Sequence, residues 1–255
     1  MTYILIILGI LILAGAFLWM KSSKQHYAIL GIAFILGVLI FSLAFWQSRQ
    51  GATSLKVVGY ASKLFESDLV KWNLTFQKGL GTNELPNGYR NMSRDLEAFK
   101  KYLLEQGIKE DEISILPANS YTRHDNYGNM SGYTLNQSVT VLSSDLDKIA
   151  ELALSPDFFA ERGMQMSNSN LEYLYTKLPE LKQQLLSEAT SDALSRAKEI
   201  SGAAKTKLGK MQEARAGVFQ ITEPYSTDVS DYGIYNTSTR KKSISVTLSA
   251  VFRLK

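Results

Sequence analysis

The chain of 255 residues contains no cysteine, which excludes disulfide bonds, cysteine-based zinc sites and thiol chemistry. Any folded domain in this chain must therefore be stabilised by its core alone. The absence of cysteine fits a domain of the cell envelope, although cytoplasmic proteins can lack cysteine as well.

A large excess of charge of either sign is also missing. Three of the 28 basic residues, Lys21, Lys24 and Arg49, lie within the first 50 residues, which contain no acid. The other 25 basic residues are balanced by 24 acidic ones. A nucleic-acid-binding domain normally carries a basic patch or a strongly basic net charge. We therefore expect no nucleic-acid partner.

Charged residues are absent from two apolar runs near the N-terminus, residues 2–20 and 27–47. Each run has close to the roughly 20 apolar residues that an α-helix needs to cross a bilayer. Buried core helices normally show a polar stripe, and neither run has one. The alternative is a cleaved signal peptide, with a cleavage site at residues 14–16, but no basic segment precedes the first run. We therefore expect residues 1–50 to form a transmembrane helical hairpin.

The segment between the two runs, residues 21–26, gives the expected orientation of this hairpin. Lys21 and Lys24 lie in the segment together with His26, and short loops rich in lysine stay on the cytoplasmic side. Residues 21–26 are therefore expected to form a cytoplasmic loop. Two crossings would then place residues 51–255 in the periplasm.

Residues within the runs are candidates for contacts with lipid and with other helices. Trp19, Tyr27 and Trp46 lie at the ends of the runs, where aromatic rings favour the headgroup region of the bilayer. Ala33 and Gly37 are four residues apart, a spacing of small residues that lets a second helix approach closely. The expected partners of this part are the lipid bilayer and, through Ala33 and Gly37, another helix.

Residues 51–255 show strand and helix periodicities in alternation. In residues 69–78, Val70, Trp72, Leu74 and Phe76 alternate with polar residues, which is typical of a half-buried strand. Further strands are expected at 55–61, 113–123, 133–142, 163–175, 211–221 and 242–254. Apolar spacings of three and four predict helices at 87–106 and 178–207, and a short helix at 145–154. This order predicts an α+β fold with helices packed on a mainly antiparallel sheet.

Three details refine this pattern. Ser144 and Asp147 resemble a capping box that opens the helix at 145–154. Pro117 interrupts the strand expected at 113–123, so that strand should bulge there or lie at an edge. A loop of roughly twenty residues separates the last two strands, which is long for a compact domain and predicts a mobile or an interacting segment.

Three stretches of residues 51–255 resemble the SIMPL domain, which is found in bacterial periplasmic and outer-membrane immunogenic proteins and in oxidative-stress-defence proteins. They are LKVVGYASKLFESDLVKWNLTFQ, GYTLNQSVTVLSSDLDKIAEL and LLSEATSDALSRAKEISGAAKTKLGKM. The resemblance covers residues 55–255. It implies an envelope protein whose domains assemble into large rings or hollow barrels, and therefore a homo-oligomer.

The resemblance supplies no catalytic residues and no cofactor. Similar proteins often carry a cleaved signal peptide, whereas in this sequence the two apolar runs take its place. We therefore expect a protein held in the bacterial inner membrane, with its SIMPL-like domain in the periplasm. Such a domain could not diffuse freely.

Few residues suggest chemistry. His124, next to Asp125 in a turn, is the only histidine outside residues 21–26, and no Gly-x-Ser-x-Gly motif accompanies it. The pair Gly79 and Gly81 lacks the third glycine of a dinucleotide-binding loop. Asp145 and Asp147 are explained by their place at the start of a helix, where the dipole favours acids. We expect no enzymatic activity, no cofactor and no metal site.

Tyrosines gather in two predicted loops. Those flanking the first hairpin turn are Tyr121, Tyr127 and Tyr133, and those in the long loop are Tyr225, Tyr232 and Tyr235. Exposed tyrosines suit interfaces, while tyrosines of a hairpin can also pack across strands. Two functions follow as hypotheses. One is a self-assembling, non-enzymatic envelope protein linked to stress tolerance or envelope organisation. The other is a periplasmic module that binds a ligand or peptide through these tyrosines.

Overall fold

The computed structural model describes residues 23–49 and 53–255, and it describes side-chain surroundings for residues 31–46 and 53–255. The first expected transmembrane helix, together with Trp19 and Lys21, lies outside the described residues. Helix α2 (Ser23–Arg49) is continuous, so Lys24 and His26 lie in the helix and not in a connecting loop. The physical reason is that residues 23–26 contain no glycine or proline, and lysine and glutamine are good helix formers.

The described side chains of α2 are apolar, except for Ser42, and mostly exposed. Phe34, Phe41 and Trp46 have exposed fractions of 74%, 71% and 66%, and Ala33 is half-buried. Apart from the backbone of α2 itself, no atom of the described residues would lie within 4 Å of a Cβ at Gly37. Among the described residues, no helix combines the length and apolar character needed to cross a membrane. The expected hairpin is therefore unconfirmed.

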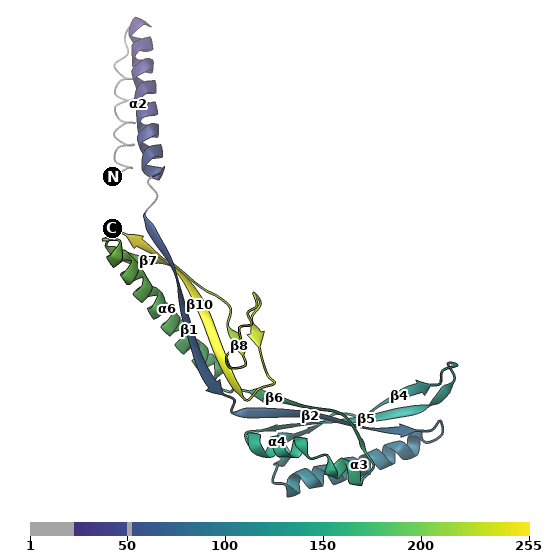
Figure 1. Ribbon diagram of the computed structural model, residues 1–255. Helices are drawn as coiled ribbons and strands as arrows, with labels where there is room; N and C mark the ends of the chain where they lie inside the picture. The colour runs from purple at the N-terminus through teal and green to yellow at the C-terminus, as the bar shows by residue number, and fades with distance from the viewer. Residues whose placement is uncertain (1–22, 50–52) are drawn as a thin grey trace.

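From Ser54 onward the chain folds around two sheets, which Figure 1 shows. Each sheet has its own hydrophobic core. The predicted α+β class is confirmed, because helices pack on sheets whose pairings are antiparallel, apart from a short parallel contact between β8 and β9. The expectation of one sheet is wrong. The strands predicted at 55–61 and 69–78 belong to different sheets, and the chain passes from one sheet to the other at Ser67 and Asp68.

Sheet A contains the first and last strands of the domain. It consists of β1 (Ser54–Glu66), β7 (Leu208–Ala216), β8 (Gln220–Thr222), β9 (Ile234–Tyr235) and β10 (Lys241–Leu254). Strand β1 pairs with β10 along its whole length, from Ser54 opposite Arg253 to Glu66 opposite Lys241. Helix α6 (Leu178–Ala203) covers one face of this sheet.

Helix α6 packs on sheet A through small residues. Its buried positions recur every four residues, at Leu181, Leu185, Ala189, Ala193, Ala197 and Ser201. Ile200 lies outside this stripe and is 47% exposed. The alanines permit a very close approach, since a Cβ added at Gly59 of β1 would lie 2.1 Å from the carbonyl oxygen of Ala189.

Sheet B holds the second core. Its strands are β2 (Leu69–Leu80), β3 (Ile113–Ile115), β4 (Asn119–His124), β5 (Met130–Ser143) and β6 (Gln165–Leu174), in the order β3-β5-β2-β6 with β4 also on β5. Its helices are α3 (Leu85–Glu105), α4 (Leu146–Leu154) and α5 (Asp157–Glu161), and a 3₁₀ turn, η1, covers Glu110–Glu112. Trp72, Phe76 and Phe99 meet in the centre of this core with edge-on ring contacts at 6.2 Å and 6.1 Å between centroids.

Two local predictions, the interrupted strand at Pro117 and the cap of the helix at 145–154, can be compared with the structure. The strand expected at 113–123 divides into β3 and β4 around Pro117, as expected from its missing N–H. The cap of α4 differs from the expected one: Asp145, not Ser144, accepts the backbone N–H of Lys148 at 3.1 Å. Asp147 is thereby free for a different contact, described below.

Candidate interaction site

The two sheets meet at a junction where the chain passes from β1 to β2 and from β6 to α6. Backbone hydrogen bonds cross this junction, from Ser67 N–H to the carbonyl of Arg240 (3.0 Å), from Asp68 N–H to that of Leu174 (3.1 Å) and from Tyr173 N–H to that of Thr237 (2.7 Å). The two passages are therefore joined to each other and to the segment that precedes β10.

Asp68 ties the two passages together through its side chain. Its carboxylate accepts the Thr176 backbone N–H at 2.8 Å and the Thr176 hydroxyl at 2.6 Å. Charge-assisted hydrogen bonds of this length are stronger than neutral ones. Residues 68 and 176 are 108 positions apart in the sequence, so this contact depends on the assembled fold.

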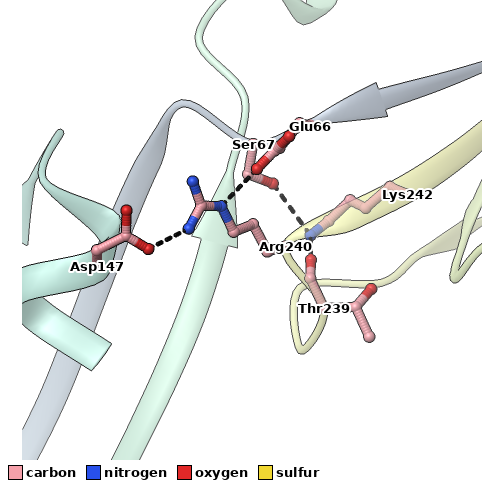
Figure 2. A network of polar contacts seen from close by, with 6 residues as sticks. All are labelled: Glu66, Ser67, Asp147, Thr239, Arg240 and Lys242. Carbon is pink, nitrogen blue, oxygen red and sulfur yellow. Dashed lines mark hydrogen bonds and ion pairs between the residues drawn. The ribbon is translucent and has the colours of Figure 1, made fainter. Parts of the chain in front are cut away.

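Arg240 links acidic groups from both sheets, as Figure 2 shows. Its Nε lies 2.6 Å from Glu66 Oε1 at the end of β1, and its Nη1 lies 2.5 Å from Asp147 Oδ1 on α4. Asp147 holds the pKa of this guanidinium above its ordinary value. Because Arg240 and Asp147 are partly or largely exposed, the pair orients the sheets more than it stabilises the protein.

Lys242 is the buried charged residue of this junction. Its side chain is 2% exposed, and Nζ donates to Ser67 Oγ at 3.3 Å and to the carbonyl of Thr239. The ring of Tyr173 lies 5.9 Å from Nζ. Burial lowers the pKa of this amine from 10.5 to about 8, because a charged ammonium loses its hydration there.

Apart from Asp147, which the sequence analysis assigned to the start of a helix, the junction residues were not singled out from the sequence. A signal was available, since Lys242 occupies an inward position of β10, in step with the buried Ile244, Val246, Leu248, Ala250 and Phe252. A lysine in such a register needs a buried partner. Its partners, Ser67 and Thr239, could not be identified from spacing alone, because they come from different turns.

The two predicted tyrosine groups lie on different sheets. Tyr121 and Tyr127 belong to the β4–β5 hairpin, with exposed fractions of 60% and 90%, while Tyr133 packs against the core of sheet B. Tyr225, Tyr232 and Tyr235 lie in the segment after β8, with exposed fractions of 91%, 98% and 49%. The structure therefore does not gather them into one site, and Tyr133 follows the alternative of packing across strands.

The predicted turn around His124 is organised by its neighbour. The Asp125 carboxylate accepts the backbone N–H groups of Tyr127 and Asn129, each at 2.9 Å, and the bond from Asn129 is the main reason that the pKa of Asp125 lies below its ordinary value. His124 itself is exposed. In the described part of the chain, no three His, Asp or Glu residues are grouped so as to hold a metal ion.

A hollow of about 500 Å³ lies over the outer face of sheet A, the face opposite α6. Its lining includes Tyr60 of β1, Thr247 of β10, and Val218 and Val229 of the segments around β8. Val229 is 82% exposed and Val218 is 44% exposed. A second hollow of about 560 Å³ lies beside the junction and includes Tyr225.

The buried ammonium of Lys242 gives a testable pH dependence. Since its pKa is about 8 in the folded protein and 10.5 ordinarily, the unfolded state binds more protons between these values, and stability rises with pH in that window. We expect the unfolding free energy of the wild type, relative to Lys242→Met, to increase from pH 8 to pH 10 in chemical denaturation. Lys241→Met, an exposed neighbour on the same strand, is the control and should show a flat difference. A flat difference for Lys242→Met would contradict the assignment.

Comparison with known families supports the resemblance seen in the sequence. The SIMPL family, described as a protein of unknown function (DUF541), matches residues 55–252. This range begins in β1 and ends in β10, so it includes both sheets and the junction. The search of curated proteins finds no match. The chain therefore belongs to the SIMPL family.

Proposed function

We propose that this protein is a membrane-anchored, self-assembling protein of the bacterial cell envelope, with its SIMPL domain in the periplasm. In this proposal the protein is not an enzyme, and it contributes to envelope organisation or stress tolerance through its assembly. The observation that carries the proposal is the exposed apolar surface on the outer face of sheet A.

That surface follows β1. Val58, Tyr60 and Leu64 point away from α6, with exposed fractions of 49%, 49% and 57%, and the hollow with Val218 and Val229 adjoins Tyr60. Large exposed apolar patches mark interaction surfaces. A second copy of the chain is the partner that the resemblance to ring-forming proteins favours.

The face of β1 is a better contact than its edge. An unpaired edge strand can add a strand from another chain, but the Tyr60 N–H donates to Asp192 of α6 at 2.8 Å. This bond holds the pKa of Asp192 below its ordinary value. Because the Asp192 side chain already accepts a backbone N–H in the middle of the β1 edge, this edge is a poor site for adding a strand. Assembly is therefore proposed to use the exposed side chains on the outer face of β1.

Anchoring in the membrane is proposed from the uncharged sequence run that includes most of α2. The helix has 27 residues, a length of about 40 Å at 1.5 Å per residue. Its described side chains, residues 31–46, are fewer than the roughly 20 that a crossing needs, but the uncharged run extends in the sequence from Tyr27 to Gln47. The apolar run at 2–20 would supply the second crossing.

The exposed tyrosines favour a second candidate function, a module that binds a ligand or peptide in the periplasm. Tyr127 and Tyr232 are 90% and 98% exposed, and such side chains supply contact area at low entropic cost. Replacing both by alanine should then lower the affinity of a bound peptide without changing the particle mass. An unchanged affinity would exclude this candidate.

The topology can be measured with a reporter enzyme that is active only in the periplasm. Fused after Lys255, it should be active in growing cells, because two crossings return the chain to the outer side of the inner membrane. The same fusion after residue 25, between the two apolar runs, is the matched control and should be inactive. Activity of the control, or inactivity of the fusion after Lys255, would contradict the proposed orientation.

Assembly predicts a particle mass that is a multiple of 28.5 kDa, measured by light scattering with correction for bound detergent. Two lysines introduced by Val58→Lys and Leu64→Lys should shift the particle to the monomer mass, because buried unpaired charges are costly at an interface. Ile200→Lys, at a 47% exposed position of α6, is the control and should keep the wild-type mass. A monomeric wild type would refute self-assembly.

A further inference from the structure

The helices that pack on sheet B cover only one of its two faces. Helices α3, α4 and α5 lie on the face that carries Trp72, Leu74 and Phe76. Since side chains alternate along a strand, the intervening residues point to the opposite face. Figure 1 shows that face between the β4–β5 hairpin and the junction.

The opposite face is polar and uncharged over most of its area. The strand registers align its side chains in four rows that run across the strands. The first row is Ser114, Thr140, Asn73 and Asn170, and the second is Ser138, Thr75 and Asn168. The third row is Asn119, Asn136, Gln77 and Gln165, and the fourth is Tyr121 and Thr134. We call these residues the amide face. Charged side chains occur only at its ends, with Lys71 and Glu172 at one and Arg123 at the other.

Half of the amide face is already hydrogen-bonded within itself. Asn73 accepts from the Thr140 hydroxyl at 3.1 Å and donates to Glu172 at 2.7 Å. Thr75 and Ser138 share a hydrogen bond at 2.9 Å. These contacts fix the side chains of the first two rows, near the Lys71 end.

The other half, toward the hairpin, has unused hydrogen-bonding groups. Asn136 Oδ1 is enclosed and has no hydrogen-bond partner among the described residues. Its neighbours Gln77, Asn119 and Thr134 likewise make no side-chain hydrogen bond within the described chain. Tyr121 lies opposite Thr134 and is 60% exposed, so an aromatic ring borders this set of donors and acceptors.

These features select the chemistry of a ligand. A phosphate or sulfate group would find one cation at the hairpin end, Arg123, whose guanidinium already donates to the carbonyl of Leu80 at 3.1 Å, and no cation among the other rows. An apolar surface would leave the amides and hydroxyls without partners, which is costly. Carboxamides and hydroxyls both donate and accept, as the hydroxyl and acetamido groups of a sugar do. We propose that the amide face binds a neutral glycan chain, with the Tyr121 ring packed against the apolar face of one sugar.

The dimensions of the face fit an extended chain. Four strands span about 14 Å across and four rows span about 20 Å along the strands. This area accommodates several sugar residues lying flat, with the hairpin half as the tighter end. The proposal concerns sheet B alone and does not depend on self-assembly through sheet A.

Saturation-transfer NMR tests the proposal, because it detects weak binding of a small ligand to a large particle. The probe is a tetrasaccharide of N-acetylglucosamine, added to the full chain in a detergent without sugar headgroups. We expect saturation transfer to the probe. The double variant Asn119→Ala and Tyr121→Ala should weaken binding about tenfold, because it removes one amide and the bordering ring.

Tyr127→Ala is the matched control, since Tyr127 belongs to the same hairpin but lies at its tip, outside the amide face. It should bind the probe as the wild type does, and a sulfated tetrasaccharide should show no transfer to any of the proteins. The proposal is overturned if the wild type gives no transfer at millimolar probe, or if the double variant binds equally well. It is also overturned if the double variant instead lowers the particle mass, which would make the amide face a contact between copies.

Discussion

A buried ammonium group at the junction constrains how the two sheets meet. Lys242 lies at the start of β10 in sheet A, and its Nζ is satisfied by Ser67 and by the carbonyl of Thr239. Because a buried charge is costly without hydrogen bonds, the passage from β1 to β2 and the turn before β10 must hold fixed positions. Asp68 adds a bond to the passage from β6 to α6, so both connections between the sheets are secured at one place.

Because the junction fixes how the two sheets meet, it also fixes the orientation of the uncovered face of sheet A relative to that of sheet B. Each sheet is covered by helices on one side only, and the uncovered sides differ in chemistry. Sheet A presents valine, leucine and tyrosine along β1, which suits burial against another protein. Sheet B presents amides and hydroxyls, which suits a ligand that returns hydrogen bonds. An assembly formed through sheet A would therefore repeat the face of sheet B at regular intervals, and many weak contacts would act together.

Periodicity predicted most individual elements of the SIMPL domain but not their division into two sheets. The alternation of Val70, Trp72, Leu74 and Phe76 identified β2, and the spacing in residues 178–207 identified α6. The junction could not be predicted, because most of its contacts join residues far apart in the sequence, such as Asp68 with Thr176 and Ser67 with Lys242. The amide face was equally hidden, because it exists only once the registers of five strands are known. Lys242 was the one local signal, a lysine in an inward position.

The central claim is that the junction holds the two sheets as one rigid unit. Because the chain has no cysteine, Glu105→Cys on α3 and Glu199→Cys on α6, both exposed, introduce two unique sites for spin labels. Pulsed electron resonance on the labelled protein, diluted with unlabelled protein to suppress distances between copies, measures the separation of the two sheets. A single narrow distance distribution is the predicted result. A broad or bimodal distribution would show that the sheets move independently and would contradict the account.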